Sequence, residues 1–412
     1  MPILTRHRSS QRDTGLHTPA LRVTSHEHTS VPVVVNVAHV AGGPGIDEFD
    51  LMLRPTEYAS FATQIEWISR AYQDAIEALG LDPQTALFRR YFCSDLKNQT
   101  PARHGWPLAV SRALREPCAE SWICQAPEAP ARVAVWAHHL RDRNGPLARI
   151  INGSSLRLLR GELSHYWSAG SSCVESETSF DQTTGILSEY ERFLRAQGMS
   201  LERNLIRTWL FVQNVDINYQ GLVAARREFF ALHGLTPETH FVASTGIEGT
   251  LADSRALIAM DAYAIGGIRE EQITYLKAPG HLGPTHLYGV TFERATSVAY
   301  RDRKHVFISG TASIDPEGRV LHPGDAERQL DRAVENVRAL LEQAGAALAD
   351  LAILIAYARD PADLAMVTRK LRAKCGNVPL AVLHAPVCRP GWLVEIEGRA
   401  CVAEDNPGLL AF

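Results

Sequence analysis

Hydrophobic and polar positions follow the same order three times along the chain. The three segments are residues 71–95, 189–214 and 336–360. Each begins with the apolar spacing of an amphipathic helix and continues through a glycine and a polar turn into an apolar, aromatic-bearing run. The run stops at Asp or Asn, 15, 16 and 15 residues after Gly80, Gly198 and Gly345. Glycine ends helices because it adopts positive φ without a steric penalty, so the spacing predicts a helix, a turn and a strand in each repeat.

Alternating apolar and polar residues predict a further strand after each of these segments. These strands cover residues 131–140, 255–265 and 392–402. Before the helices of the second and third repeats, strands starting at His165 and His305 lead into turns of small residues. The predicted unit is ββαβαβ-like and about 110 to 130 residues long, with helices over one face of an antiparallel sheet.

We therefore predict an α+β fold of three tandem units. The uncovered face of each sheet has to be buried, and three units packed sheet to sheet would form a pseudo-trimer with a central closed barrel. The predicted divisions are an N-terminal extension (1–30), a degenerate first repeat (31–155), a second repeat (156–275) and a third repeat (276–412).

Composition narrows the functional class. The 412 residues are 45% hydrophobic and 21% charged, with a formal charge of -4, which gives no electrostatic footprint for nucleic acid or an anionic membrane. Seven cysteines without a CxxC pair predict neither a disulfide framework nor a zinc site. We expect a cytoplasmic protein without a metal, either a monomer or a small homo-oligomer.

Four stretches of the third repeat together resemble the Rid (YjgF) family. They read HVFISGTASIDPEGRV, QLDRAVENVRALLEQAGA, AYARDPADL and LVEIEGRA. The resemblance implies Rid-like (chorismate mutase-like) units, which in this family usually assemble as homotrimers with sites between subunits. Leu380 stands near the place of the arginine that Rid imine deaminases use, so deaminase activity is not the implied function.

Further stretches resemble the chorismatase branch of this fold, over about residues 160–402. They read LIRTWLFVQNVD, VASTGIEGT, YGVTFERAT, HPGD and CRPGWLVEIEG. This resemblance implies an enzyme that needs no cofactor and splits chorismate into pyruvate and a cyclic acid, for secondary metabolism. The partner it implies is therefore a small carboxylic acid. Cys388 lies seven residues before Glu395, a spacing typical of the members that form 3-hydroxybenzoate. The branch's arginine between Tyr-Gly and Phe has no counterpart here.

Glu395 and Cys388 are the predicted catalytic residues. Alternation places Glu395 opposite the face of Val394 and Ile396, toward an interior cleft where a poorly solvated carboxyl has a raised pKa and can act as a general acid. The alternative for Glu395 is a solvated edge-strand position. For Cys388, beside Arg389, we expect an exposed thiol with a lowered pKa, or else a small buried hydrophobic residue.

The resemblance also implies a set of substrate-binding residues. These are Arg207, Thr245, Gly246, Tyr288, Arg294, Gly310 and Arg389. The arginines would bind carboxylates through forked donors, and Gly310 would let a substrate ring approach the backbone. Two alternatives remain open: a hydrolase, tautomerase or cyclase acting on another biosynthetic intermediate, and a non-catalytic small-molecule-binding module.

Overall fold

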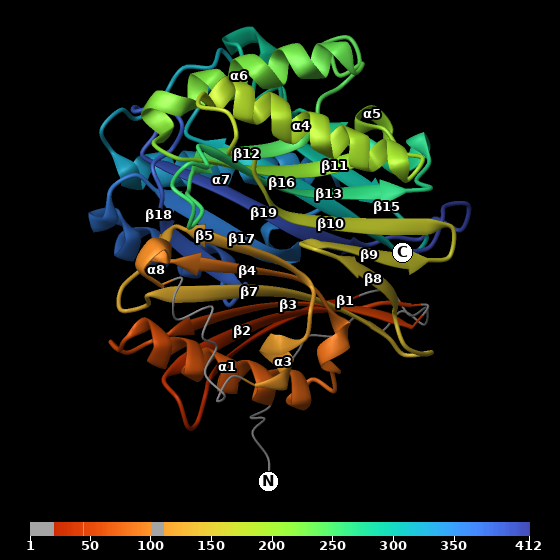
Figure 1. Cartoon of the computed structure of the whole chain (residues 1–412), viewed down its shortest axis with the longest axis vertical. Coiled ribbons are helices and arrows are strands. Elements are labelled where there is room, and N and C mark those ends of the chain that lie inside the picture. The colour runs from red at the N-terminus through yellow and green to blue at the C-terminus, as the bar shows by residue number, and fades with distance from the viewer. Residues whose placement is uncertain (1–19, 44, 100–110) are drawn as a thin grey trace.

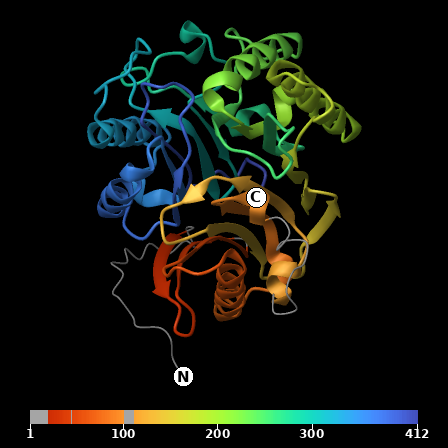
Figure 2. The same cartoon turned by 60° about the vertical axis from the view of Figure 1, so that its left-hand side comes forward.

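The structure, a computed structural model, describes residues 20–43, 45–99 and 111–412. Its strands form three mixed sheets of six, six and seven strands, which confirms the α+β class. In Figures 1 and 2 the sheets face one another in the middle of the molecule and the helices lie outside. The predicted closed barrel is not found in the described part, because hydrogen bonds link the strands into three separate sheets.

The first sheet has the order β1-β2-β3-β7-β4-β5. Its strands are β1 (Ala20–Glu27), β2 (Val33–Ala41), β3 (Ile46–Pro55), β7 (Val133–Asp142), β4 (Ala86–Cys93) and β5 (Ala119–Cys124). Helix α1 (Phe61–Ala78) and the short α3 (Arg112–Arg115) accompany it. Residues 1–19 of the predicted extension lie outside the described residues, whereas the remainder supplies strand β1, which pairs with β2.

The second sheet has the order β12-β11-β13-β10-β9-β8. Its strands are β12 (Ala243–Glu248), β11 (Leu205–Val212), β13 (Ile258–Gly266), β10 (Leu163–Ser171), β9 (Ser155–Arg160) and β8 (Ala148–Asn152). Its helices are α4 (Ser179–Ala196), α5 (Leu201–Asn204) and α6 (Val215–Leu232). Helices α4 and α6 lie side by side over its outer face (Figure 1).

The third sheet has the order β14-β15-β16-β19-β17-β18-β6. Its strands are β14 (Ile273–Leu276), β15 (Ala295–Ala299), β16 (Arg303–Ala312), β19 (Val394–Ala403), β17 (Leu351–Ala358), β18 (Leu380–His384) and β6 (Ala126–Pro127). Helices α7 (Ala326–Gln343) and α8 (Leu364–Cys375) accompany it. Strand β6 comes from the first part of the chain, directly after β5, so it connects the edge of the first sheet to the edge of the third.

The described residues also form five 3-10 helices along the chain. They are η1 (Pro83–Thr85), η2 (Glu270–Gln272), η3 (Thr285–Tyr288), η4 (Leu348–Asp350) and η5 (Pro361–Asp363).

The three sheets share one local topology. Strands β4, β11 and β17 each have a parallel neighbour (β5, β12, β18) and an antiparallel neighbour (β7, β13, β19). Each antiparallel pair has its register shift at the same place, directly after the first residue of β4, β11 or β17. The helix ends predicted at Gly80, Gly198 and Gly345 are confirmed, with φ of 66°, 72° and 71°.

The inner faces of the three sheets share one buried core. Phe88, Phe211 and Phe307, one from each sheet, belong to the same cluster of buried residues. Separate clusters lie beneath α1 in the first unit and beneath α4 and α6 in the second. No described helix is long and apolar enough to cross a membrane.

Candidate active site

A pocket lies where the second and third sheets meet. Strand β12 runs beside β16: the Gly310 amide donates to Thr245 Oγ1 (2.9 Å) and the Ser244 amide to Ser309 Oγ (2.9 Å). The space within the pocket, open solvent included, is about 480 Å³. A more open hollow shares Cys388 with it and leads to solvent.

The pocket brings together eight of the nine residues predicted from sequence. They are Thr245, Gly246, Tyr288, Arg294, Gly310, Cys388, Arg389 and Glu395. These positions span about 150 residues of chain and meet because β12, η3, β16 and β19 converge at one seam. Arg207 does not line this pocket: it points toward the interior and pairs with Glu397, so direct substrate contact by Arg207 is not supported.

Glu395 is the buried acid of the pocket. Its side chain projects from β19, 5% of the residue is exposed, and no hydrogen bond to its carboxyl is found in the described chain. Burial, reinforced by the charge of Glu397, raises its pKa to about 8 against the opposing charges of Arg207 and Arg294. The carboxyl is therefore mainly protonated at neutral pH.

Gly310 makes room for that carboxyl. A Cβ placed on Gly310 would lie 2.1 Å from Glu395 Oε1 and 3.2 Å from Thr245 Cγ2. Any larger residue would displace the acid, because real Cβ atoms do not approach other atoms this closely. The close approach that the sequence suggested for a substrate ring is made instead by Glu395 itself.

Three guanidinium groups line the pocket without an ion-pair partner among the described residues. Arg226 of α6 donates to Thr291 Oγ1 and Ser244 Oγ, both at 3.2 Å. Arg294 donates twice to the Gly283 carbonyl (3.2 and 2.8 Å). Arg389 donates to the Tyr288 carbonyl (3.1 Å) and stacks on the Tyr288 and Trp392 rings.

Burial of unpaired guanidinium groups is costly unless an anion compensates them. Burial lowers the pKa of both Arg226 and Arg294, and the nearby acid Glu395 is neutral near pH 7. The pocket lining therefore carries an excess of positive charge, which favours a ligand with more than one carboxylate.

Of the two alternatives predicted for Cys388, the structure favours the buried one. The side chain is not an exposed thiol: it is partly buried against the pocket, packs on the hydrophobic core and hydrogen-bonds with Tyr219. Burial, with the neighbouring Glu395, raises the pKa of the Cys388 thiol to about 12 and outweighs the lowering by Arg389. The group is a neutral thiol at physiological pH.

Sequence reasoning missed two pocket residues on one helix. Tyr219 and Arg226 lie seven residues apart on α6 and both reach the pocket. Arg226 is 2% exposed and lies on the face of Leu222 and Phe230, which are also buried. A charged residue within an apolar stripe is the signal that would have identified it.

A second cavity lies in the centre, where the three sheets face one another. Its walls are mainly aromatic and include Trp136, Trp167 and Trp209. Its Arg207 and Arg399 are both in ion pairs with buried carboxylates. The cavity thus lacks the unpaired positive charge and neutral acid that distinguish the pocket of Glu395.

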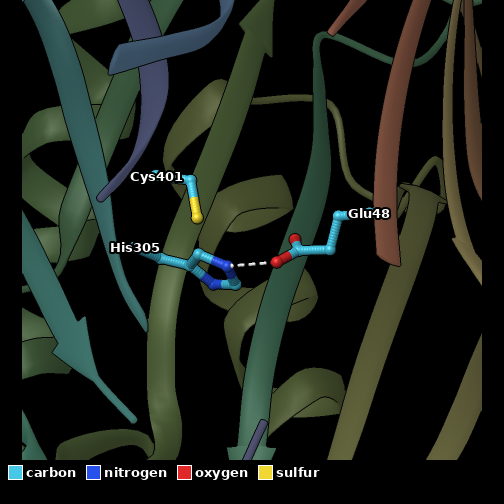
Figure 3. Close-up of side chains that lie close together, drawn as sticks. All are labelled: Glu48, His305 and Cys401. Atoms are coloured by element: carbon cyan, nitrogen blue, oxygen red, sulfur yellow. Dashed lines mark hydrogen bonds and ion pairs between the residues drawn. The ribbon is translucent and has the colours of Figure 1, made fainter. Parts of the chain in front are cut away.

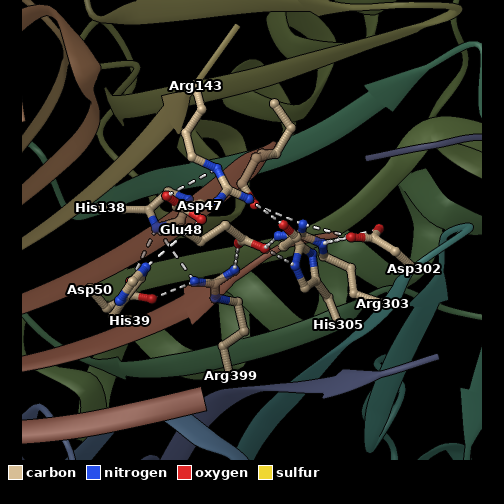
Figure 4. Close-up of polar contacts among 12 residues, drawn as sticks. His39, Asp47, Glu48, Asp50, His138, Arg143, Asp302, Arg303, His305 and Arg399 are labelled. Atoms are coloured by element: carbon tan, nitrogen blue, oxygen red, sulfur yellow. Dashed lines mark hydrogen bonds and ion pairs between the residues drawn. The ribbon is translucent and has the colours of Figure 1, made fainter. Parts of the chain in front are cut away.

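One group of side chains has metal-ligand chemistry. The ligand atoms of Glu48, His305 and Cys401 lie within 4.8 Å of one another (Figure 3). The Glu48 carboxylate already accepts hydrogen bonds from His305, Arg303 and Arg399 (Figure 4). A cation here would face two guanidinium groups, so these residues are better suited to joining the first and third sheets than to holding a metal.

Part of the chain is similar in sequence to known proteins. Residues 293–402 match the family model described as Endoribonuclease L-PSP. A RutC family protein of Pyrococcus abyssi is 34% identical over 133 residues, which are 32% of this chain and 96% of that protein. A RutC family protein of Pyrococcus horikoshii is 31% identical over 106 residues, 25% of this chain and 84% of that protein.

A longer match connects the chain to a chorismatase. The chorismatase of Streptomyces rapamycinicus is 30% identical over 217 residues, 47% of this chain and 63% of that protein. The crystal structure of a chorismatase aligns with 77% of this chain and 93% of its own, with a TM-score of 0.59 and 21% identity, and thus shares the fold. Since the Pyrococcus abyssi protein is 34% identical and is covered over 96% of its length, we conclude that this chain belongs to the RutC (Rid/YjgF) family.

Proposed function

We propose that this protein is a chorismatase-like enzyme. It would cleave the enolpyruvyl ether of chorismate, or of a closely related dicarboxylic acid, and release pyruvate. The observation that carries the proposal is the pairing, in one buried pocket, of a protonated carboxyl at Glu395 with three guanidinium groups that lack carboxylate partners. The similarity to chorismatase, which spans 63% of that relative, supports it.

In the proposed reaction Glu395 is the general acid. Its proton passes to the terminal methylene carbon of the enol ether, and the resulting oxocarbenium ion is attacked by water. The adduct collapses to pyruvate and a ring alcohol, and the proton released by the water restores the Glu395 acid. This sequence consumes one water and gives a dihydrodiol; loss of pyruvate without net water gives a hydroxybenzoate.

We also propose that the three units form a pseudo-trimer divided near residues 155 and 275, with one active seam. By strand pairing, Glu395 lies opposite Tyr357, and the equivalent partners of Phe211 and Phe92 are Ala259 and Ala134. Neither alanine can donate a proton. Only the seam between the second and third units therefore carries the acid at this position.

The direct test is pyruvate production from chorismate by the purified protein, measured with lactate dehydrogenase and NADH. We expect turnover by the intact chain and identification of the ring product by chromatography. If no pyruvate forms while chorismate raises the melting temperature, the pocket binds a dicarboxylate without this chemistry. If neither effect occurs, the chorismatase proposal is wrong and another biosynthetic intermediate becomes the candidate substrate.

Replacing Arg226 by methionine is expected to raise KM for chorismate by about 10- to 100-fold. This is the effect expected when a charge-assisted hydrogen bond to a carboxylate is lost. Arg227→Met is the matched control, since Arg227 is the next residue on α6 and is exposed; its KM is expected to stay unchanged. Equal KM values for the two variants, from initial rates of pyruvate release, would contradict carboxylate binding by Arg226.

Replacing Cys388 by alanine is expected to change the identity of the ring product more than the rate. A neutral thiol beside Tyr219 offers a hydrogen bond to the ring intermediate but cannot act as a thiolate. Product ratios are measured by chromatography, with Cys375→Ala as control, because Cys375 lies on α8 and does not line the pocket. Unchanged products would make Cys388 a packing residue.

A further inference from the structure

Glu397 is the most fully hydrogen-bonded carboxylate near the pocket. It is 1% exposed. Its Oε1 accepts from Tyr357 Oη (2.6 Å) and Trp209 Nε1 (3.1 Å). Its Oε2 accepts from Arg207 Nη2 and Thr245 Oγ1. Four donors, one of them a guanidinium, fix the position of the carboxylate.

Glu397 is connected to the acid of the pocket through Thr245 and Gly310. Glu395 and Glu397 are two residues apart on β19 and therefore lie on the same face of the sheet. Thr245, which donates to Glu397, accepts from the Gly310 amide (2.9 Å). Gly310 is the residue against which the Glu395 carboxyl packs.

We propose that Glu397 is a positioning residue: four donors hold its carboxylate on the same face of β19 as Glu395, and so fix a negative charge near the Glu395 carboxyl. A negative charge near a carboxyl opposes its ionisation. The inference rests on the proposed function, since the acid form is the one that donates the proton. Arg207 then has a role different from the substrate contact predicted from sequence: it anchors Glu397.

Charged and titratable groups reach this pair from every neighbouring element. Around Glu395 they are Arg207, Tyr219, Arg226, Tyr288, Arg294, Cys388 and Arg389, and around Glu397 they are Arg90, Arg207, Tyr357 and Arg399. Among them, Arg207 and Arg294 favour ionisation of Glu395. Apart from burial, Glu397 is the strongest influence that opposes it.

The second unit offers a matched control. Asp261 occupies the position on β13 that Glu397 occupies on β19, opposite Trp209 as Glu397 is opposite Ile355. It forms an equally buried ion pair with Arg90 (2.7 Å). Two residues before it stands Ala259 instead of an acid, so Asp261→Asn breaks a comparable pair without a neighbouring Glu395.

The experiment is a pH titration of Glu395 by carbon NMR, with glutamate labelled at the side-chain carboxyl and Glu395→Gln used for assignment. In the wild-type chain Glu395 is expected to titrate near pH 8. Glu397→Gln is expected to lower that midpoint by about 1 to 2 pH units. This is the effect expected of one charge that lies two residues away on the same face of a strand. Asp261→Asn is expected to leave it in place.

A Glu395 midpoint unchanged by Glu397→Gln, or moved equally by Asp261→Asn, would overturn the inference. If Glu397→Gln does not fold, the Arg207→Met/Glu397→Gln double variant removes both charges together, which buried pairs tolerate better. It is expected to lower the midpoint by a smaller amount. The titration needs no turnover, so it tests the role of Glu397 even if the protein releases no pyruvate. Where pyruvate is released, the basic limb of the pH–rate profile moves with the NMR midpoint.

Discussion

Replacing Glu395 by glutamine is expected to lower the rate of pyruvate release from chorismate by about 10²- to 10⁴-fold, the range for loss of a general acid. Glutamine keeps the size of the side chain but has no proton to give to the methylene carbon. The measurement is kcat under saturating chorismate, with lactate dehydrogenase as the coupling enzyme.

Two further measurements separate loss of chemistry from loss of the site. Chorismate should still raise the melting temperature of Glu395→Gln, because Arg226, Arg294 and Arg389 are untouched. The wild-type rate should be constant below pH 8 and fall above it, since the pKa of Glu395 is raised to about 8 and only the protonated form is active. A Glu395→Gln variant with wild-type kcat would remove Glu395 from the mechanism.

The fold was largely predictable because each repeat carries local signals. Glycines at the helix ends and alternating strands have short-range physical causes, so their positions survive in the structure. The arrangement of the three sheets relative to one another was not predictable in the same way. Strand pairing across repeats depends on long-range packing, and even the two-residue strand β6 joins a sheet that belongs to another part of the chain.

The candidate site was predictable on its strands and less so elsewhere. Glu395 and Gly310 lie on strands whose alternation fixes the direction of the side chain. Arg207 lies on such a strand too, but its direction leads to Glu397 and not to the pocket. Arg226 belongs to a helix of a different unit, and only the tertiary arrangement brings it to the seam. Cys388 lines the pocket, but the pKa of its thiol depends on burial, which the neighbouring Arg389 in the sequence does not reveal.

Glu48 connects the first sheet to the third through hydrogen bonds and ion pairs. The Glu48 carboxylate accepts from His305 (2.8 Å), Arg303 (2.7 Å) and Arg399 (2.8 Å), all from the third sheet (Figure 4). Burial alone would raise the pKa of Glu48, but these three groups hold it well below its usual range. The carboxylate therefore stays ionised, and its stabilising effect is present above its unfolded pKa and lost only in strong acid.

Replacing Glu48 by glutamine is expected to lower the free energy of unfolding by about 3 to 5 kcal/mol, the cost of leaving buried cations without a counter-charge. Asp302 and Asp50 continue to pair with Arg303 and Arg399, which places the loss toward the lower end. The measurement is urea unfolding at pH 7, followed by tryptophan fluorescence.

The control is Glu404→Gln, which breaks the partly exposed pair of Glu404 with Lys304 and is expected to cost no more than about 1 kcal/mol. Equal midpoints for Glu48→Gln and Glu404→Gln would show that the buried network adds no more than a surface ion pair. A selective loss in Glu48→Gln would instead show that this buried carboxylate contributes to the contact between the first and third units far more than a surface ion pair does. The first unit would then stabilise the fold that positions the pocket, although it supplies no side chain that lines it.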